Sequence, residues 1–302
     1  MNNSIRKALR IGHLNINSLR NKVVDVSEIL FEHKLHILAI SETKLTPAIS
    51  SDLLKIEGYN FYRLDRDTRG GGGIAVYCQE HIPVKIRNDL GCKEIEILWL
   101  QIYLPYIKSM LVGCCYRAPD AAVVYLDNIC KMLDKVCDAN YEIFFVGDMN
   151  IDMNVKKCPL KARLLALADT CNLSQMVKKP TRIFCRADGV KSSTCIDLIF
   201  TNVPELCSKV ASFPVGNSDH NLITIGRKTK VPKGGQKIIH KRVFKNFNES
   251  DYYNEVNEVD WSEVLQNEVP DLALGAFERL LLPIMNKHAP IKKLTVRNTT
   301  SP

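Results

Sequence analysis

Carboxylate, amide, phenol and imidazole side chains recur in this sequence at the ends of apolar, strand-like runs. Buried strands of an α/β sheet open a binding crevice at their carboxyl ends, so we expect these side chains to gather in one cleft. Together they would supply what metal-assisted hydrolysis of a phosphodiester requires. The segments are Leu14–Asn17, Ser41–Thr43, Tyr116–Pro119, Val146–Asn150, Ile196–Phe200 and Asn217–His220.

Phosphodiester hydrolysis needs a cation or hydrogen-bond donors, because negative charge builds on the phosphoryl oxygens and on the leaving oxygen as water attacks in line. Magnesium takes a few carboxylate or amide oxygens and keeps several waters. Glu42, Asp219 and Asn15 have this chemistry and are the predicted metal-site residues. We therefore expect Mg²⁺ as the cofactor, and we expect Mn²⁺, which suits the same oxygen ligands, to substitute for it.

The other polar residues suit the proton and phosphate chemistry. Asp148 would polarise the attacking water, and Asn150, two residues later, would donate to a phosphoryl oxygen. His220 would donate to the phosphate when protonated, and Asp197 would fix its tautomer and raise its pKa. The hydroxyl of Tyr116 is a further donor.

Hydrophobic spacing predicts the elements that position these residues. Continuous apolar runs predict buried strands, and a 3.6-residue period predicts amphipathic helices. Strands that alternate with helices indicate an α/β fold. The predicted strands are 10–14, 35–40, 73–77, 95–104, 110–116, 141–146, 195–201 and 222–226, and the predicted helices are 22–32, 123–136 and 160–171.

The character of the sequence changes after Arg227. A basic stretch, 230–245, contains a Pro-Lys-Gly-Gly linker signal and is followed by 246–276, which has no Lys or Arg. An apolar, helical segment, 277–285, comes next. We therefore predict a catalytic domain over residues 1–228 and an extension of linker and short helices over 229–302.

Composition restricts the partners and the compartment. The 302 residues carry a net charge of +8, which suits a polyanionic partner. No run of eighteen apolar residues occurs, so we expect no membrane span. The eleven cysteines include no Cys-x-x-Cys pair and predict buried free thiols in a reducing, intracellular compartment, nuclear or cytoplasmic.

In this order, the motifs resemble those of the exonuclease–endonuclease–phosphatase superfamily. More narrowly, the chain is similar to the endonuclease domain of non-long-terminal-repeat (LINE-type) retrotransposons. The resemblance extends over residues 8–228, and the tail resembles the stretch that joins endonuclease to polymerase in such elements. Further segments that carry it are Arg20–Lys22, Gly58–Tyr59, Arg69–Val76, Pro180–Arg182, Asp260–Trp261 and Asn286–Pro290.

This resemblance implies a four-layer sandwich of two mixed β-sheets flanked by helices, with a mostly helical or irregular C-terminal extension. It implies a magnesium-dependent nick in double-stranded DNA that leaves a 3′-hydroxyl, as in target-primed retrotransposition. A retroelement RNA, or a polymerase domain in a longer polypeptide, would be a further partner. It also implies phosphate or DNA contacts at Thr181, Asn17 and Arg117.

Other interpretations remain open. The chain would alternatively be a catalytically silent, domesticated nucleic-acid-binding module, or an abasic-site nuclease or phosphatase of the same superfamily. Taken alone, Asn15 and Asn17 would be turn residues and His220 would be structural. The glycine run Gly70–Gly73 lacks the ending of a phosphate loop, so a hairpin or bulge is expected, with the arginines of Arg66–Arg69 within reach of a DNA backbone.

Overall fold

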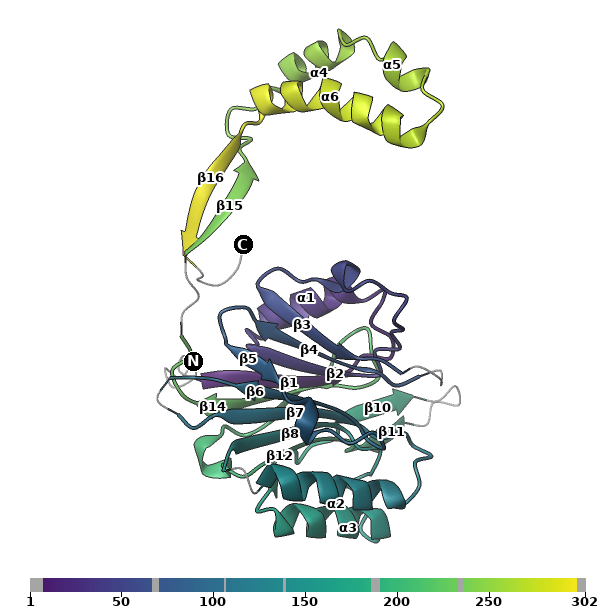
Figure 1. Ribbon diagram of the computed structural model, residues 1–302, viewed down its shortest axis with the longest axis vertical. Helices are drawn as coiled ribbons and strands as arrows, with labels where there is room; N and C mark the ends of the chain where they lie inside the picture. The colour runs from purple at the N-terminus through teal and green to yellow at the C-terminus, as the bar shows by residue number, and fades with distance from the viewer. Residues whose placement is uncertain are drawn as a thin grey trace. The chain divides into compact units, whose positions relative to one another are not determined.

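The computed structural model describes residues 8–66, 71–105, 107–137, 140–185, 191–232 and 236–297. These residues form two compact units, one that ends with Pro232 and one that begins with Gln236. Figure 1 labels most of the helices and strands of both units. The predicted site residues all belong to the first unit.

The first sheet of the first unit is mixed. Its described strands have the order β13-β14-β1-β2-β4-β3, in which β1 and β2 are parallel and the other neighbours are antiparallel. Their bounds are β1 Ala8–Asn15, β2 Ile37–Ser41, β3 Tyr59–Leu64, β4 Ile74–Gln79, β13 Ala211–Phe213 and β14 Leu222–Lys228.

The second sheet is also mixed. Its described strands have the order β5-β6-β7-β8-β12-β9, in which β7 and β8 are parallel. A separate two-stranded pair, β10 Arg182–Cys185 and β11 Lys191–Thr194, follows β9 in the chain. The bounds of the sheet strands are β5 Val84–Ile86, β6 Glu96–Ile102, β7 Met110–Tyr116, β8 Glu142–Asp148, β9 Ser174–Gln175 and β12 Asp197–Thr201.

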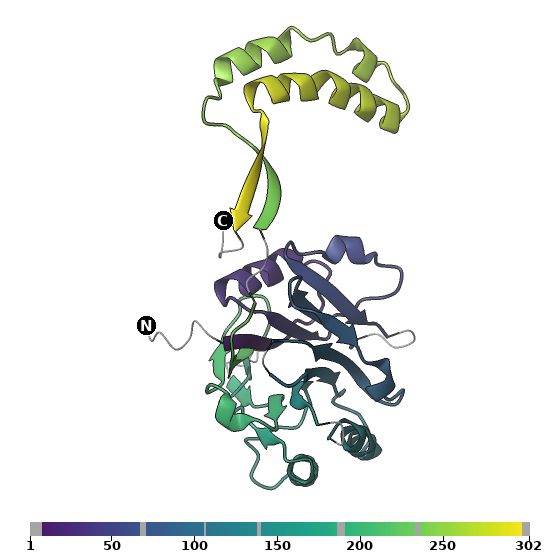
Figure 2. The same ribbon diagram turned by 60° about the vertical axis from the view of Figure 1, so that its left-hand side comes forward.

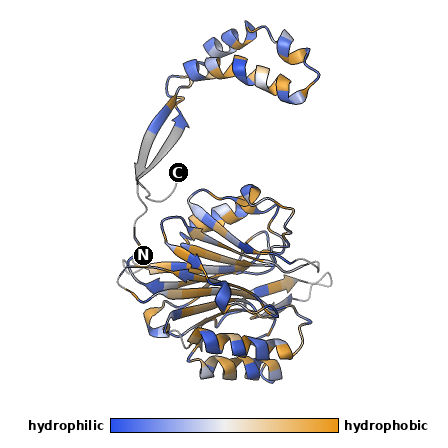
Figure 3. Cartoon of the chain, viewed as in Figure 1, coloured by the Kyte–Doolittle hydropathy of each residue, from blue (hydrophilic) through white to orange (hydrophobic). Residues whose placement is uncertain are grey.

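The two sheets pack on each other because their strands are apolar on the facing sides. In β1, Leu9 and Ile11 join one hydrophobic cluster with residues of β6, β7 and β8, while Leu14 belongs to the cluster under α1. This alternation follows from the two-residue period of a strand. Figure 3 shows the concentration of hydrophobic residues in the strands of this unit.

Helices cover the outer faces of both sheets (Figures 1 and 2). Helix α1 (Val23–Glu32) packs on the first sheet, and α2 (Val124–Cys137) and α3 (Pro159–Thr170) lie together on the second. Helix α2 buries Leu126, Ile129 and Leu133, which share one helical face. Short 3₁₀ helices occur at Ser51–Leu54, Asn88–Leu90 and Pro204–Leu206. The predicted four-layer α/β sandwich is therefore confirmed.

The second unit combines helices with a pair of strands. It contains α4 (Glu249–Asn257), α5 (Ser262–Leu265), the 19-residue α6 (Pro270–His288), and the antiparallel strands β15 (Gln236–Arg242) and β16 (Ile291–Arg297). The sequence interpretation expected linker in place of these strands. Their pairing joins segments at opposite ends of the unit, so no local pattern reveals it.

Further expectations from the sequence concern the glycine run, the cysteines and membrane spans. Gly71 to Gly73 lead into β4 with positive φ angles and belong to the β3–β4 connection, as a hairpin requires; Arg69 and Gly70 lie outside the described residues. None of the ten cysteines whose side chains are described forms a disulfide. No described helix has the length and hydropathy to cross a membrane.

Candidate active site

A cavity of about 150 Å³ lies where several strands of both sheets end or begin. The parallel strands β1 and β2 end together, with Asn15 opposite Ser41, and β7 and β8 end with Tyr116 opposite Asp148. Strand β12 begins at the same edge, because Asp197 pairs with Asp148. The cavity is lined by Asn15, Asn17, Glu42, Pro119, Asn150, Arg182, Asp219 and His220.

Glu42 is held by side chains from both sheets. Its Oε1 atom accepts hydrogen bonds from Asn15 Nδ2 at 2.8 Å and from the Tyr116 hydroxyl at 3.0 Å. Burial raises the pKa of Tyr116, and the neighbouring Glu42 carboxylate raises it further. Tyr116 therefore stays a protonated donor. The second carboxylate oxygen of Glu42 lies 4.0 Å from Lys44 Nζ, which leaves it accessible to a metal ion.

Asp148 is buried beneath the cavity. Its Oδ2 accepts from Asn15 Nδ2 at 2.9 Å, and its Oδ1 accepts from the backbone N–H of Asn150 at 2.9 Å. Burial raises the pKa of Asp148 to about 7, and the nearby Asp197 carboxylate contributes to the rise. A carboxylate with this pKa can accept a proton from water near neutral pH.

Asp197 and His220 form an oriented pair. His220 Nδ1 lies 2.9 Å from Asp197 Oδ2, which also accepts from the Thr181 hydroxyl at 2.6 Å. Because a carboxylate only accepts, Nδ1 carries the proton and Nε2 is left to other partners. Burial opposes protonation of His220, but the bond to Asp197 outweighs it and the pKa of His220 is raised.

Asp219 lies at the cavity wall beside an arginine. Arg182 Nε donates to Asp219 Oδ2 at 2.7 Å. Burial works against ionisation of Asp219, but the Arg182 guanidinium prevails and lowers its pKa. The Asp219 side chain is 27% exposed, so its carboxylate remains accessible from the cavity.

The three residues expected to contact phosphate lie in different surroundings. Asn17 lines the cavity, where its Oδ1 accepts from Lys44. The Thr181 hydroxyl is fully buried and orients Asp197. Arg117 is 2% exposed and donates to the carbonyls of Ala118 and Ala121, so it supports its own loop and does not line the cavity. Thr181 and Arg117 thus make hydrogen bonds within the protein, and their phosphate contacts stay predictions.

The backbone is left-handed at three site positions. Asn17, Glu42 and Asn150 have φ angles of 48°, 53° and 48°. This region is sparsely populated by residues other than glycine, and asparagine enters it most readily. Residues held in it cluster at functional sites, where the surrounding structure fixes them. Here the hydrogen bonds to Asn15 and Asp148 supply that restraint.

Within the described residues, two groups of side chains suit a divalent cation. In one, ligand atoms of Asp148, Asp197 and His220 lie within 4.8 Å of one another, but all three residues are buried. The other is the group predicted from the sequence, in which the Glu42 and Asp219 side chains are 21% and 27% exposed. The second group fits Mg²⁺ better, because it offers hard oxygens beside space for the waters that Mg²⁺ retains.

Sequence reasoning missed His13 as a member of the site. It is fully buried, with Nε2 3.2 Å from the Ser41 hydroxyl and Nδ1 3.5 Å from Asp197 Oδ1. Burial lowers its pKa to about 4, so His13 is neutral at pH 7. The sequence did contain a feature that could have revealed His13. It lies two residues before Asn15 in a predicted strand, and this spacing places both side chains on one face.

Solved structures with this fold include several enzymes that act on nucleic acids. The endonuclease domain of TRAS1, a telomere-specific non-LTR retrotransposon, is 16% identical, with a TM-score of 0.61 over 72% of this chain and 98% of that one. The AP endonuclease LMAP from Leishmania major is 13% identical, with a TM-score of 0.62 over 74% and 88%. The 3′ phosphatase NExo from Neisseria, bound to a product DNA hairpin, is 15% identical, with a TM-score of 0.55 over 72% and 98%.

These identities are low, so the structural matches show the fold alone. Among curated proteins, no sequence matches this chain. The sequence itself, however, matches the pattern of one family over residues 12–220, a stretch that begins in β1 and ends at His220. It therefore includes every residue of the cavity described above, and the chain belongs to the Endonuclease/Exonuclease/phosphatase family.

Proposed function

We propose that this protein is a magnesium-dependent DNA endonuclease that nicks one strand of a duplex and leaves a 3′-hydroxyl. One observation carries the proposal. A proton-accepting carboxylate, an oriented histidine and two accessible carboxylates meet at one cavity, from strand ends of two sheets. A catalytically silent binding module would not need this set of polar contacts.

Asp148 is the proposed base for the attacking water. Its pKa of about 7 lets it take the proton near neutral pH, while Asn15 and the backbone of Asn150 hold the carboxylate in place. The Asn150 side chain donates one N–H to the Arg117 carbonyl at 2.8 Å. Its second amide N–H is the proposed donor to a phosphoryl oxygen.

His220, which lines the same cavity, is the proposed donor to the phosphate. Asp197 holds Nδ1, so Nε2 is the atom that would donate to a phosphoryl oxygen in the protonated form. The Thr181 hydroxyl donates to Asp197 and holds its carboxylate in place. Tyr116 acts by orienting Glu42, since its hydroxyl is already bonded to that carboxylate.

Glu42, Asp219 and Asn15 would hold the metal ion. When bound, Mg²⁺ would neutralise charge that develops on the phosphoryl and leaving oxygens. Asn15 and Tyr116 fix the carboxylate of Glu42, and Arg182 fixes that of Asp219. In target-primed retrotransposition, the resulting 3′-hydroxyl would prime a polymerase on an RNA template.

The test compares substrates of matched length. We expect Mg²⁺-dependent cleavage of intact duplex DNA at a rate comparable to that on a duplex with an abasic site. Cleavage of the abasic duplex alone would instead identify the protein as an abasic-site nuclease. Release of phosphate without strand cleavage would identify it as a phosphatase. Duplex binding without hydrolysis of any of these substrates would identify a silent module.

A further inference from the structure

A second, larger cavity adjoins the catalytic one. It has a volume of about 1450 Å³ and shares Pro119 with the catalytic cavity. Tyr116 also lines it, although its hydroxyl reaches Glu42. Three arginines stand on its walls: Arg63, Arg66 and Arg87. We refer to this space as the side cleft.

In two of these arginines, every guanidinium nitrogen already has a hydrogen-bond partner in the protein. Arg63 donates through Nε and Nη2 to Asp65 and through Nη1 and Nη2 to the carbonyls of Ile49 and Thr46. Arg87 donates through Nε and Nη2 to Asp89, and through Nη1 to Gln101 and Tyr141. Neither guanidinium has a free edge for a ligand.

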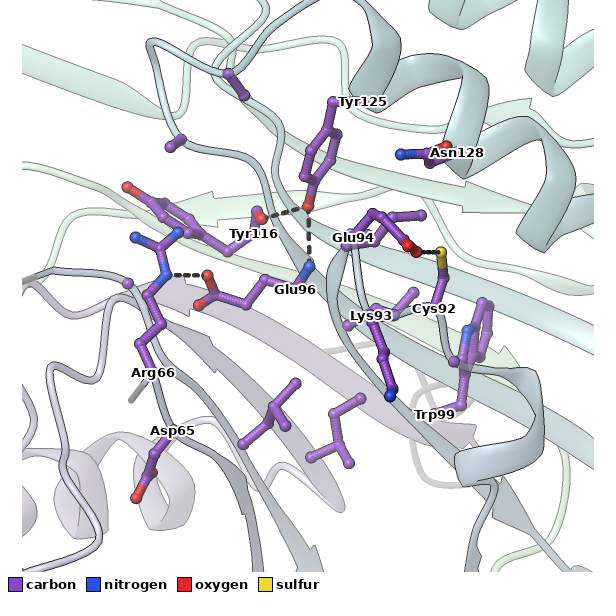
Figure 4. Close-up of a pocket in the computed structure, with 18 of the residues that line it drawn as sticks. Asp65, Arg66, Cys92, Lys93, Glu94, Glu96, Trp99, Tyr116, Tyr125 and Asn128 are labelled. Atoms are coloured by element: carbon purple, nitrogen blue, oxygen red, sulfur yellow. Dashed lines mark hydrogen bonds and ion pairs between the residues drawn. The ribbon is translucent and has the colours of Figure 1, made fainter. Parts of the chain in front are cut away.

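Arg66 differs from both. Its Nε donates to Glu96 Oε2, and its guanidinium carbon lies 5.4 Å from the centre of the Tyr116 ring. Within the described part of the chain, its Nη1 and Nη2 atoms have no hydrogen-bond partner, and its side chain is 26% exposed. Figure 4 shows the guanidinium between Tyr116 and Glu96. Its unused N–H donors are therefore available to an acceptor from outside the protein.

The glycine run and Glu96 hold Arg66 in this position. The backbone N–H of Gly73 donates to Glu96 Oε1, so one carboxylate fastens both the glycine segment and the arginine. A Cβ atom at Gly72 would lie 2.3 Å from Arg66 Nε, so only glycine leaves room for the guanidinium there. Tyr125 adds support, because its hydroxyl donates to the Tyr116 carbonyl at 2.8 Å and accepts from the Glu96 N–H.

We propose that Arg66 binds a backbone phosphate of the DNA strand in the side cleft, beside the phosphate that is cleaved. A guanidinium with free Nη atoms suits the oxygens of a phosphate, and stacking on Tyr116 places it next to the catalytic cavity. The proposal rests on the proposed function for its substrate. It makes Arg66 a binding residue and Glu96 its positioning residue.

The test removes the phosphate-binding group without changing the net charge. The double variant Arg66→Gln with Glu96→Gln replaces a partly buried ion pair by two neutral side chains, and so avoids leaving either charge unpaired. The matched control, Arg87→Gln with Asp89→Asn, makes the same exchange at an arginine of the same cleft whose donors are filled. Glu96→Gln alone keeps the arginine. Duplex DNA binding of the full chain is measured in chelator across a salt series, with thermal melting to verify folding.

We expect the log–log salt dependence of binding to become shallower by about 0.9 in the Arg66 double variant, because this variant neutralises one phosphate fewer. Between 50 and 200 mM salt, the wild type should then lose about 3- to 4-fold more affinity than this variant. The control should keep both the affinity and the slope of the wild type. Glu96→Gln keeps the charge of Arg66 and therefore the slope, but it should bind DNA more weakly, because Arg66 loses the carboxylate that holds it in place. An unchanged slope in the folded Arg66 double variant, or an equal change in the control, would overturn the proposal.

Because DNA binding is measured in the presence of chelator, the salt dependence does not depend on whether the protein cleaves DNA. Wild-type protein that binds DNA but fails to nick it with Mg²⁺ would refute the proposed function while leaving the Arg66 test valid. Wild-type protein that nicks DNA, with a salt slope that does not depend on Arg66, would refute only the phosphate contact.

Discussion

At Asp148, burial and catalysis act on the same carboxyl group. Burial raises its pKa from 3.8 to about 7 in the metal-free fold, whereas an unfolded chain would leave it near 3.8. Between these values the folded state holds a proton that the unfolded state has released, so stability falls as pH rises from 4 to 7. The site is therefore built at the expense of stability at neutral pH.

Replacing this carboxyl by an amide should reverse that loss. We expect Asp148→Asn to be more stable than the wild type at pH 8 in chelator, by at most about 4 kcal/mol, and the difference to shrink as the pH approaches 4. Chemical denaturation at several pH values measures it. A stability difference that does not vary with pH would show that Asp148 has an ordinary pKa.

The sequence predicted the chemistry of single residues better than their contacts. Asp197 was expected to orient His220, and it lies 2.9 Å away. Arg117 turns back onto the carbonyls of Ala118 and Ala121, which depends on the folded shape of its loop, and the position of Arg66 depends on Glu96, far away in the sequence. Neither could be predicted from the sequence. Thr181 was expected at phosphate, yet its hydroxyl reaches Asp197, because β10 begins beside β12 only in the folded chain.

At the scale of elements, apolar runs predicted the central strands of both sheets but not the edge strands, and the arrangement in two sheets was implied by the family resemblance. Central strands such as β7 and β8 are buried throughout, and their apolar runs are recognised from the sequence alone. The edge strand β3 is only partly buried and has no continuous apolar run. The strands of the separate pair, β10 and β11, carry polar residues and have no such run either. Edge strands are defined by their partner more than by their own composition.

The close approach of β7 and β8 depends on Gly147. A Cβ atom there would lie 1.8 Å from the Cys115 carbonyl oxygen, and the φ of 153° disfavours other residues. We expect Gly147→Ala to destabilise the fold by roughly 2–4 kcal/mol and to displace Asp148. Thermal or denaturant unfolding measures this.

The matched control is Gly216→Ala, since nothing lies within 4 Å of a Cβ at that position. It should change stability by less than about 1 kcal/mol. Equal stability of both alanine variants would mean that β7 and β8 can separate without loss, which contradicts the packing described here.

At the scale of the whole molecule, the first unit has its own core and contains the entire candidate site. Val231 packs against this core, so the unit continues a few residues past residue 228, where the sequence predicted the end of the catalytic domain. In the second unit, Lys241 of β15 faces Lys292 of β16, with Lys293 beside them. These exposed cations suit additional contacts with a DNA backbone.

A chain that ends at Pro232 should therefore keep its chemistry and bind DNA more weakly. We expect the Mg²⁺-dependent rate at saturating DNA to be retained, with lower affinity at physiological salt and a salt slope shallower by about 0.9 for each phosphate that the second unit no longer neutralises. Single-turnover nicking by both chains over a salt series tests this. A folded short chain whose saturated rate collapses would show that the second unit contributes to catalysis.

Single-turnover nicking of supercoiled plasmid DNA by the wild type, Asp148→Asn and His220→Ala tests the central claim most directly. We expect nicking in Mg²⁺ or Mn²⁺ but none in chelator, with 3′ ends that a DNA polymerase extends without pretreatment. Each variant should be slower by roughly 10²–10⁴-fold, the usual effect of losing a positioned acid or base, with DNA affinity nearly unchanged. Full activity in chelator, or variants that bind DNA as poorly as they cleave it, would contradict the account.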